Sequence, residues 1–236
     1  MKKLTTALLF LTVVCLHACR KVTGEGPVKT ETRTATDFSG ISLGAPVEVI
    51  YTPSNEYRIE IEAQQNIIDV IQTYVSHHEL RLRLKDNTII RPSEQVRVTV
   101  SAPYINSLAV SGSGSVKALQ PVSSTAMKLS VSGSGSILLN SLQTGALEAD
   151  ISGSGEMQVL NGSADHEDIQ VSGSGRIDLT NLLAQTAKTE TSGSGSIKIY
   201  VEKTLDAHIS GSGSVYYKGS PTVSSHVSGS GRIEKL

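Results

Sequence analysis

The tetrapeptide Ser-Gly-Ser-Gly occurs seven times between residues 111 and 231 of this 236-residue chain. The copies begin at Ser111, Ser132, Ser152, Ser172, Ser192, Ser210 and Ser228, so the intervals between them are 21, 20, 20, 20, 18 and 18 residues. A near-constant period of about 20 residues is a coil length for a β-solenoid, in which each coil pairs with the next. The repeat therefore predicts stacked coils and not a flexible Gly/Ser linker.

The residues on either side of the motif alternate between apolar and polar in register with it. The position before the motif holds Val110, Val131, Ile151, Val171, Thr191, Ile209 and Val227. The position five residues after its start holds Val116, Ile137, Met157, Ile177, Ile197, Val215 and Ile233. An apolar column of this kind, with polar residues at the intervening positions, is typical of strands that turn one face towards a core.

The motif itself is predicted to form a repeated corner or flat strip of each coil. Its glycines allow a close approach of the opposite wall or unusual backbone angles, and its serines stack about 4.8 Å apart as a ladder of hydroxyl groups. The structural residues of the repeat are Ser111, Gly112, Ser132, Gly133, Ser152, Gly153, Ser172, Gly173, Ser192, Gly193, Ser210, Gly211, Ser228 and Gly229.

The fold expected from these patterns is all-β: a single-chain β-solenoid, a right-handed parallel β-helix of about 20 residues per coil. We expect the repeats to occupy residues 106–236. Residues 35–105 lack the motif but alternate as strands, for example in Leu80–Asn87 and Val96–Pro103. They are predicted to form a β-rich N-terminal part that packs on the first coil and caps it, with Asn66–Val75 as a short helix or a buried strand.

The N-terminus has the features of a targeting segment. Two lysines, an apolar stretch too short to span a bilayer and small residues lead to Leu16-His17-Ala18-Cys19, which resembles a bacterial lipobox. We therefore predict a signal peptide over residues 1–18, lipidation of Cys19 and a lipidated tether over residues 19–34. The expected location is the outer membrane, on its periplasmic or its surface side. With Cys19 lipidated, the exported chain has no second thiol for a disulfide.

Several segments together resemble a known family. "FSGISLGAPVEVIY", "LRLRLKDN" and "VRVTVSAPYINSLAVSGSGSV", followed by repeated GSGxI segments, are similar to the putative auto-transporter adhesin, head GIN domain family. The resemblance runs from about Asp37 to the C-terminus. It implies a β-helical protein of the bacterial envelope, and it carries over no catalytic or binding residues.

The sequence offers little catalytic chemistry. The net charge of −1 and the lack of a basic run argue against nucleic acid as a partner, and no phosphate-binding Gly-x-x-x-x-Gly-Lys occurs. Adjacent coils would place Glu190, His208 and His226 at one outward position, where they are weak candidates for a metal site. The acidic run Asp165–Asp168 is expected to be a loop, and the adjacent His77 and His78 are a weak metal signal. We predict no catalytic residues and no cofactor.

The leading functional hypothesis is a non-enzymatic, lipid-anchored envelope protein with an elongated binding surface. Its partners would be the membrane, through the lipid, and an unknown glycan or protein, as for an adhesin or a scaffold. One alternative is a β-helix enzyme acting on polysaccharides, for which Asp150, Glu156, Arg176 and Asp178 would have to cluster across coils. Another is a periplasmic carrier of a lipid or a small ligand, which requires a cavity in the core.

Overall fold

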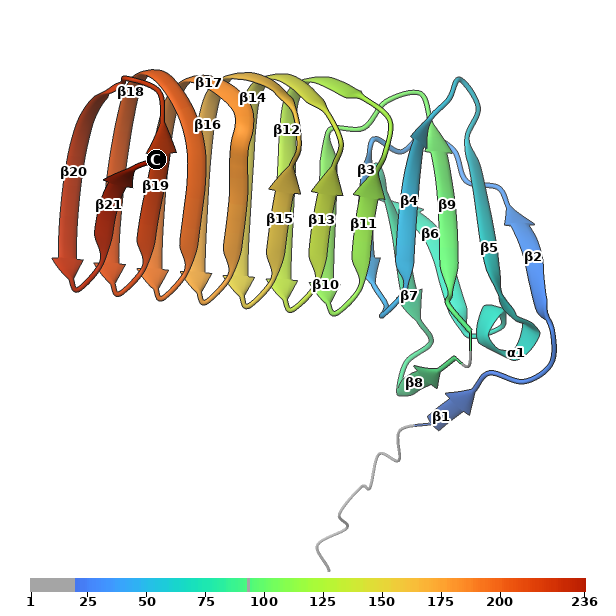
Figure 1. Ribbon diagram of the computed structural model, residues 1–236. Coiled ribbons are helices and arrows are strands. Elements are labelled where there is room, and N and C mark those ends of the chain that lie inside the picture. The colour runs from blue at the N-terminus through green and yellow to red at the C-terminus, as the bar shows by residue number, and fades with distance from the viewer. Residues whose placement is uncertain (1–19, 93) are drawn as a thin grey trace, which may run out of the picture.

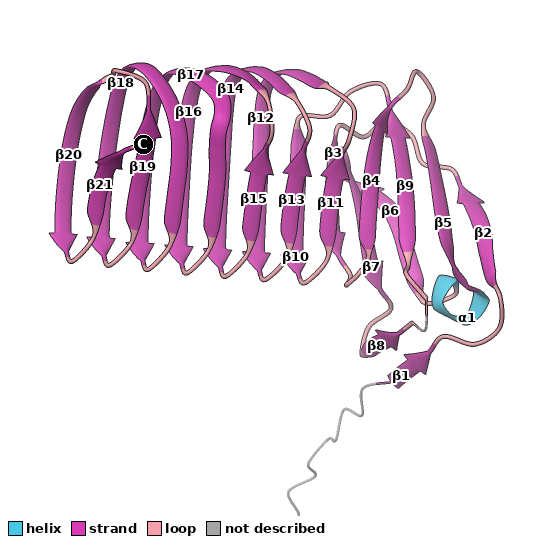
Figure 2. Ribbon diagram, in the orientation of Figure 1, coloured by secondary structure: helices cyan, strands magenta, loops and turns pink. Residues whose placement is uncertain are grey.

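The computed structural model describes residues 20–92 and 94–236, and these residues form a parallel β-solenoid (Figures 1 and 2). Each coil has two main walls that meet at the Ser-Gly-Ser-Gly motif. The strand before the motif belongs to wall A and the strand after it to wall B, and the two longest strands contribute to both walls. The predicted all-β solenoid is thus confirmed.

Wall A is a continuous parallel ladder in which every strand pairs with the corresponding strand of the next coil. Its strands in spatial order are β7 (Glu79–Leu84), β3 (Gly40–Gly44), β10 (Ser107–Gly112), β12 (Val122–Gly133), β14 (Leu142–Gly153), β16 (Gly162–Gly173), β17 (Arg176–Gly193), β18 (Ser196–Gly211) and β20 (Thr222–Gly229).

Wall B repeats this arrangement on the other side of the motif. Its strands are β9 (Arg97–Ala102), β4 (Glu48–Pro53), β11 (Ser115–Ala118), β13 (Ser136–Leu139), β15 (Glu156–Val159), the first halves of β17 and β18, β19 (Ser214–Lys218) and β21 (Arg232–Lys235).

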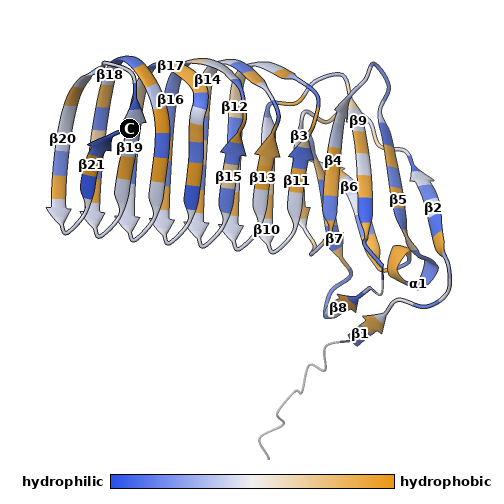
Figure 3. Cartoon of the chain, in the orientation of Figure 1, coloured by the Kyte–Doolittle hydropathy of each residue, from blue (hydrophilic) through white to orange (hydrophobic). Residues whose placement is uncertain are grey.

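The core lies between the walls and is formed by the predicted apolar columns. The column before the motif is buried from Val110 to Ile209, and the column five residues after its start is buried from Val116 to Val215. Figure 3 shows the resulting alternation of apolar and polar residues along the strands. Since each coil places the same residue types over those of the coil before it, the core continues through the solenoid without a break.

The coil architecture begins earlier than the motif does. Strands β7 and β9 form one coil, and β3 and β4 form the next. Residues 35–105 were predicted to be a cap on the first coil, but they also contribute these two coils to the solenoid. Strand β3 pairs with β10 in register, Leu43 beside Val110. The corner between these strands is formed by Leu43-Gly44-Ala45-Pro46-Val47 in place of Ser-Gly-Ser-Gly. Because the motif is missing, the repeat does not reveal this coil.

The N-terminal end of the solenoid is closed by antiparallel strands. Strand β6 (Ile71–Ser76) pairs with β7, β5 (Arg58–Gln64) pairs with β9, and β2 (Val28–Arg33) pairs with β5. The segment predicted as either a helix or a strand contains both, the short helix α1 (Gln65–Ile68) followed by β6.

The predicted tether over residues 19–34 is wrong for the residues that the structure describes. Strand β1 (Arg20–Thr23) pairs with β8 (Thr88–Arg91), with Val22 opposite Ile90 and both side chains buried. Strand β2 follows almost at once. The polar composition that suggested a flexible segment instead belongs to strands that are largely exposed: β1 buries only Val22, and no residue of β2 is buried.

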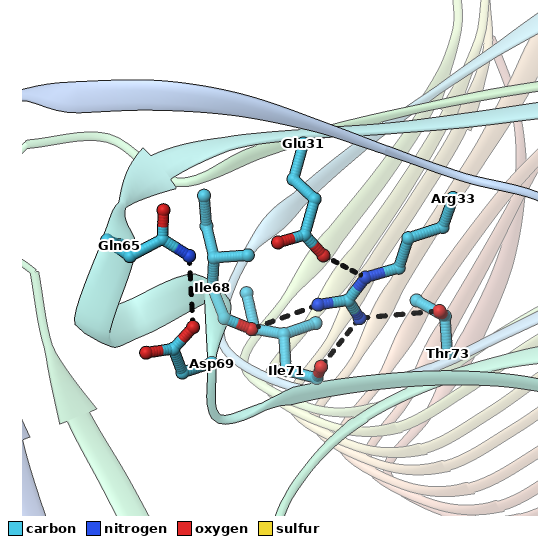
Figure 4. Close-up of polar contacts among 7 residues, drawn as sticks. All are labelled: Glu31, Arg33, Gln65, Ile68, Asp69, Ile71 and Thr73. Carbon is cyan, nitrogen blue, oxygen red and sulfur yellow. Dashed lines mark hydrogen bonds and ion pairs between the residues drawn. The ribbon is translucent and has the colours of Figure 1, made fainter.

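Arg33 joins three elements of this N-terminal cap (Figure 4). Its guanidinium donates to the carbonyl oxygens of Ile71 at 2.7 Å and Ile68 at 3.1 Å, and to the carboxylate of Glu31 at 2.7 Å. The two carbonyls belong to β6 and to the end of α1. Arg33 therefore satisfies backbone acceptors that no neighbouring strand covers.

Replacement of Arg33 by Met should destabilise this cap. The two carbonyls would lose their charged donor, and a loss of about 2–3 kcal/mol in the free energy of unfolding is expected. Hydrogen exchange should rise first in α1 and β6. Arg58→Met removes an exposed Arg–Glu pair on β5 and serves as the control, with an expected effect below about 1 kcal/mol. Equal effects of the two substitutions would contradict the role of Arg33.

Candidate functional site

The most developed hollow on the described surface is a groove on the outside of wall A, with a volume of about 690 Å³. It runs across the coils from β12 to β20, beside the corners made by the motif. Two outward columns line it. The first is the serine that begins each of the last six motifs: Ser132, Ser152, Ser172, Ser192, Ser210 and Ser228. The second lies two residues earlier: Ser130, Asp150, Gln170, Glu190, His208 and His226.

The register of wall A builds both columns. Ser152 pairs with Ser172 and Asp150 with Gln170, and the same pairing continues from coil to coil. The predicted ladder of serine hydroxyls is therefore present, with neighbouring rungs about 4.8 Å apart. The first serines of all seven motifs are exposed.

The motif glycines hold the corner beside the groove. The first glycine of each copy has a positive φ, for example +117° at Gly173, a conformation that side chains disfavour. The backbone ladder continues through the corner, because the amide of Ser174 donates to the carbonyl of Gly153 at 2.9 Å and that of Arg176 to Gly155 at 3.0 Å. The groove thus has an edge of hydrogen-bonded main chain.

Both polar and apolar atoms form the surface of the groove. Val131, Ile151, Val171 and Ile209 line the groove, but their side chains point into the core and each residue is at most 2% exposed. What they offer to a ligand is mainly main chain. Side-chain contacts to a ligand would come from the hydroxyl, carboxyl, amide and imidazole groups of the two columns.

Charged side chains flank the groove on the same strands. Lys128 forms ion pairs with Glu148 and, at 3.9 Å, with Asp150, and Lys188 pairs with Glu190 at 2.7 Å. Burial in the groove, reinforced by the nearby Glu148 carboxylate, raises the pKa of Asp150. The hydrogen bond from Lys128 to Glu148 raises the pKa of the lysine. One outward column of wall A contains three acids and two lysines: Lys128, Glu148, Asp168, Lys188 and Asp206. Acidic groups therefore outnumber lysines along this part of the wall.

The three weak metal candidates stand on adjacent coils, as their spacing predicts. Glu190 pairs with His208 and His208 with His226 in the wall A register, and the two imidazole rings are 6.1 Å apart between centroids. Glu190 is engaged by Lys188, and His208 Nε2 lies 3.1 Å from Asp206. Within residues 20–92 and 94–236, no three such groups converge as metal ligands.

The residues named for a polysaccharide enzyme do not form one cluster. Asp150 lies in the groove on wall A, whereas Glu156 and Arg176 lie opposite each other on wall B. Asp178 is also on wall B and accepts hydrogen bonds from the amide and hydroxyl of Thr180. Asp150 is therefore on a different outward face from Glu156, Arg176 and Asp178, so the four residues do not surround one glycosidic bond.

Two other predictions concern histidines and acids. His77 and His78 form the turn between β6 and β7, both with positive φ, and His78 Nδ1 lies 3.5 Å from Asp37. The prediction of a loop for the acidic run Asp165–Asp168 is wrong. The run lies inside β16, and Glu167 occupies a core position with its side chain fully buried. Cys19 lies outside the described residues.

The comparison with protein families matches residues 37–221 to the putative auto-transporter adhesin, head GIN domain family. The chain belongs to this family. The match covers both the coils without the motif and almost all of those that carry it. None of the curated proteins compared matches the chain.

Solved structures of similar proteins share the solenoid. A putative adhesin from Bacteroides fragilis NCTC 9343 is 26% identical, with a TM-score of 0.86 over 91% of this chain and 100% of that one. A putative lipid binding protein from Parabacteroides distasonis ATCC 8503 is also 26% identical, with a TM-score of 0.77 over 92% and 100%. A putative adhesin from Parabacteroides merdae ATCC 43184 has a TM-score of 0.75 at 24% identity, which shows the fold alone.

This head GIN domain protein therefore has an adhesin-like fold. Only one part of its wall A groove was predicted from the sequence. The sequence placed the outward column of Asp150, Gln170 and Glu190 on adjacent coils, but not the groove that this column forms with the serines. Its one described helix, α1, is too short to cross a membrane.

Proposed function

We propose that the protein is an exported, lipid-anchored and non-enzymatic binding protein that holds an extended glycan along the wall A groove. The groove carries the proposal: one hollow of about 690 Å³ crosses several coils and presents a serine hydroxyl on each, beside a second polar side chain whose type varies. A ligand with repeated hydroxyl groups matches such a periodic surface. The adhesin-like family and its solved relatives support a binding role.

The groups in the groove are suited to hydroxylated ligands. The carboxylates of Asp150 and Glu190 accept hydrogen bonds, the amide of Gln170 both donates and accepts, and the serine hydroxyls do either. An acyl chain would find few exposed apolar side chains, because the core residues beneath the groove are covered by main chain. This favours a glycan over the lipid named for the Parabacteroides distasonis relative.

A groove-filling substitution tests the site. Gln170→Trp places a large ring between the two columns and should weaken the binding of a glycan by at least about tenfold, which corresponds to 1.4 kcal/mol. Gln158→Trp is the matched control, since Gln158 faces outward on wall B. Its effect should stay below about twofold. The probe is the tightest ligand from a glycan array, and its affinity is measured by calorimetry.

Two outcomes would contradict this proposal. Equal losses in the two variants would show that the ligand does not use wall A. Binding of fatty acids or phospholipid vesicles, with no binding on the array, would favour a lipid carrier.

The anchor is tested separately from the groove. We propose lipidation at Cys19, so Cys19→Ser should abolish labelling with radioactive palmitate and release the protein from the membrane fraction. Protease treatment of intact cells then distinguishes the surface from the periplasm. Digestion before lysis fits an adhesin, whereas protection until lysis would leave the groove for ligands inside the envelope.

A further inference from the structure

The two ends of the solenoid are built differently. At the N-terminal end, β2 has charged residues at every second position (Lys29, Glu31 and Arg33), a pattern that protects edge strands from pairing with other chains. Arg33 also binds backbone carbonyls of α1 and β6. That end is therefore closed within the chain.

The opposite end lacks comparable protection among the described residues. Among the described strands β20 pairs only with β18 and β21 only with β19, so their outer edges are unpaired, and β20 contains no Asp, Glu, Lys or Arg. Val223 and Val227 occupy core columns but are 37% and 41% exposed, whereas Leu205 and Ile209, one coil earlier, are 1% and 2% exposed. Apolar core and unpaired backbone thus lie open together.

We propose that this last coil is an interface with a second copy of the chain, joined end to end about a two-fold axis through antiparallel pairing of β20 with β20 and β21 with β21. The proposal is independent of what the wall A groove binds. Figure 1 shows the open end, formed by β20 and β21, at the far end of the solenoid from β1 and β2.

The sequence of β20 is complementary to itself in the antiparallel direction. With Ser225 on the two-fold axis, Val223 lies opposite Val227 of the second copy, and Ser225 lies opposite its own equivalent. All three positions face the core in the preceding coils. Because opposite residues of an antiparallel pair point to the same side, the two cores would meet with their apolar side chains in contact.

Strand β21 is also complementary to itself in the antiparallel direction, through opposite charges. With Ile233 on the axis, Ile233 meets its own equivalent on the inner side, and Arg232 meets Glu234 of the second copy on the outer side. The two ions already pair within one chain at 3.7 Å. The opposite register, one residue further along, would place Arg232 against Lys235 and is disfavoured.

One axis passes near both strands. Ser225 and Ile233 are the residues placed on the axis in β20 and β21. Ser225 lies four residues before Gly229, and Ile233 lies three residues after Ser230. Both are therefore at similar distances from the corner that joins walls A and B. Such an isologous contact consumes the open edge of each copy. The assembly stops at a dimer because the N-terminal ends are closed, and it places the two N-terminal ends at its opposite extremes.

Sedimentation equilibrium of residues 20–236, which contain all described elements, tests the association. We expect a dimer that dissociates as the protein is diluted. The double substitution Val223→Lys and Val227→Lys puts four like charges into the contact and should raise the dissociation constant at least about tenfold. Leu119→Lys is the control, since Leu119 is 52% exposed between β11 and β12, and should change it less than about twofold.

Cysteine cross-linking tests the register. Both cysteines of the chain, Cys15 and Cys19, precede residue 20, so an introduced thiol is unique. Ser225→Cys should form an intermolecular disulfide under mild oxidation, since directly opposite Cβ atoms are about 4.5–5.5 Å apart. Ser220→Cys lies five residues from the axis, so its two copies would be about 33 Å apart and should not cross-link.

The outcomes are distinct. A monomer at all concentrations would overturn the proposal, and so would a dimer that is unaffected by the two lysines. Cross-linking at Ser220→Cys but not at Ser225→Cys would overturn the proposed register. Circular dichroism of the lysine variant distinguishes a lost contact from an unfolded coil. If the variant is unfolded, the cross-linking result alone decides.

Discussion

Replacement of Gly173 by Ala should destabilise the solenoid by about 3–5 kcal/mol, one of the largest effects that a single methyl group can have in this fold. Gly173 has φ +117°, and a Cβ atom at this position would lie 2.5 Å from the carbonyl oxygen of Gly153 in the preceding coil. That oxygen accepts the amide hydrogen of Ser174. The methyl group would therefore separate two coils at the corner where their hydrogen bonds are continuous.

Gly112→Ala is the matched control for this prediction. Gly112 is the first glycine of the first motif and has φ +97°, but a Cβ atom there would meet nothing within 4 Å. Its substitution carries only the conformational strain, about 1–3 kcal/mol. Urea denaturation of both variants measures the difference. Equal losses would show that strain, and not the contact between coils, makes glycine necessary.

Ser172→Ala separates the two residue types of the motif. The Ser172 side chain is exposed and lies in the groove, so its loss should change stability by less than about 0.5 kcal/mol. The serines and glycines then have different roles: the glycines permit the corner, and the serines supply the outward ladder. A loss above about 2 kcal/mol would show instead that the serine hydroxyls are structural.

The solenoid could be predicted because its repeat encodes the register directly. Stacking places equal positions of successive coils side by side, so a sequence alignment of the seven motifs is also a list of strand pairs. Ser152 beside Ser172 and Ile151 beside Val171 follow from their positions alone, and the structure has both pairs. Few folds allow long-range pairing to be derived from local spacing in this way.

The N-terminal coils could not be found by the same method. Their corner, Leu43–Val47, shares no motif with the others, and β5, β6 and β2 run antiparallel. The alternation of residues shows that these segments are strands but does not show which strands pair. The contact that closes the end, Arg33 with the carbonyls of Ile68 and Ile71, joins residues 35 and 38 positions apart.

The candidate site was predictable as a column but not as a groove. The positions of Asp150, Gln170, Glu190 and His208 on adjacent coils follow from the repeat. The depth of the surface between this column and the serines depends on how the strands curve towards the corner, which residue spacing does not specify. The spacing also does not show that Lys188 and Asp206 engage Glu190 and His208.

Glu167 was placed in a loop because it stands in an acidic run, yet it lies in the core. Its side chain is fully buried, and neither carboxylate oxygen has a hydrogen-bond partner. Leu147 and Ala187 occupy the same column on the adjacent coils. Desolvation by this burial raises the pKa of Glu167 well above its usual value, so the protonated form is favoured in the folded protein.

This raised pKa makes stability depend on pH. In the unfolded chain the carboxyl ionises near its ordinary pKa, while in the folded chain it keeps its proton to higher pH. The contribution of the bound proton is complete below the unfolded pKa and is lost as pH rises towards the folded value, at up to about 1.4 kcal/mol per pH unit. The melting temperature should therefore fall as pH rises above the ordinary pKa of a carboxyl group.

Glu167→Leu should stabilise the protein at pH 8 by about 2–4 kcal/mol, because it removes a buried, unpartnered polar group and continues a column that already contains Leu147 and Leu205. The substitution should also flatten the fall in melting temperature from pH 5 to pH 8. Glu156→Gln, at an exposed position on β15, is the control and should leave the pH profile unchanged. An unaltered profile in Glu167→Leu, or a lower stability at pH 8, would mean that the carboxylate has partners inside the core. In that case Glu167 would stabilise the folded protein through those partners.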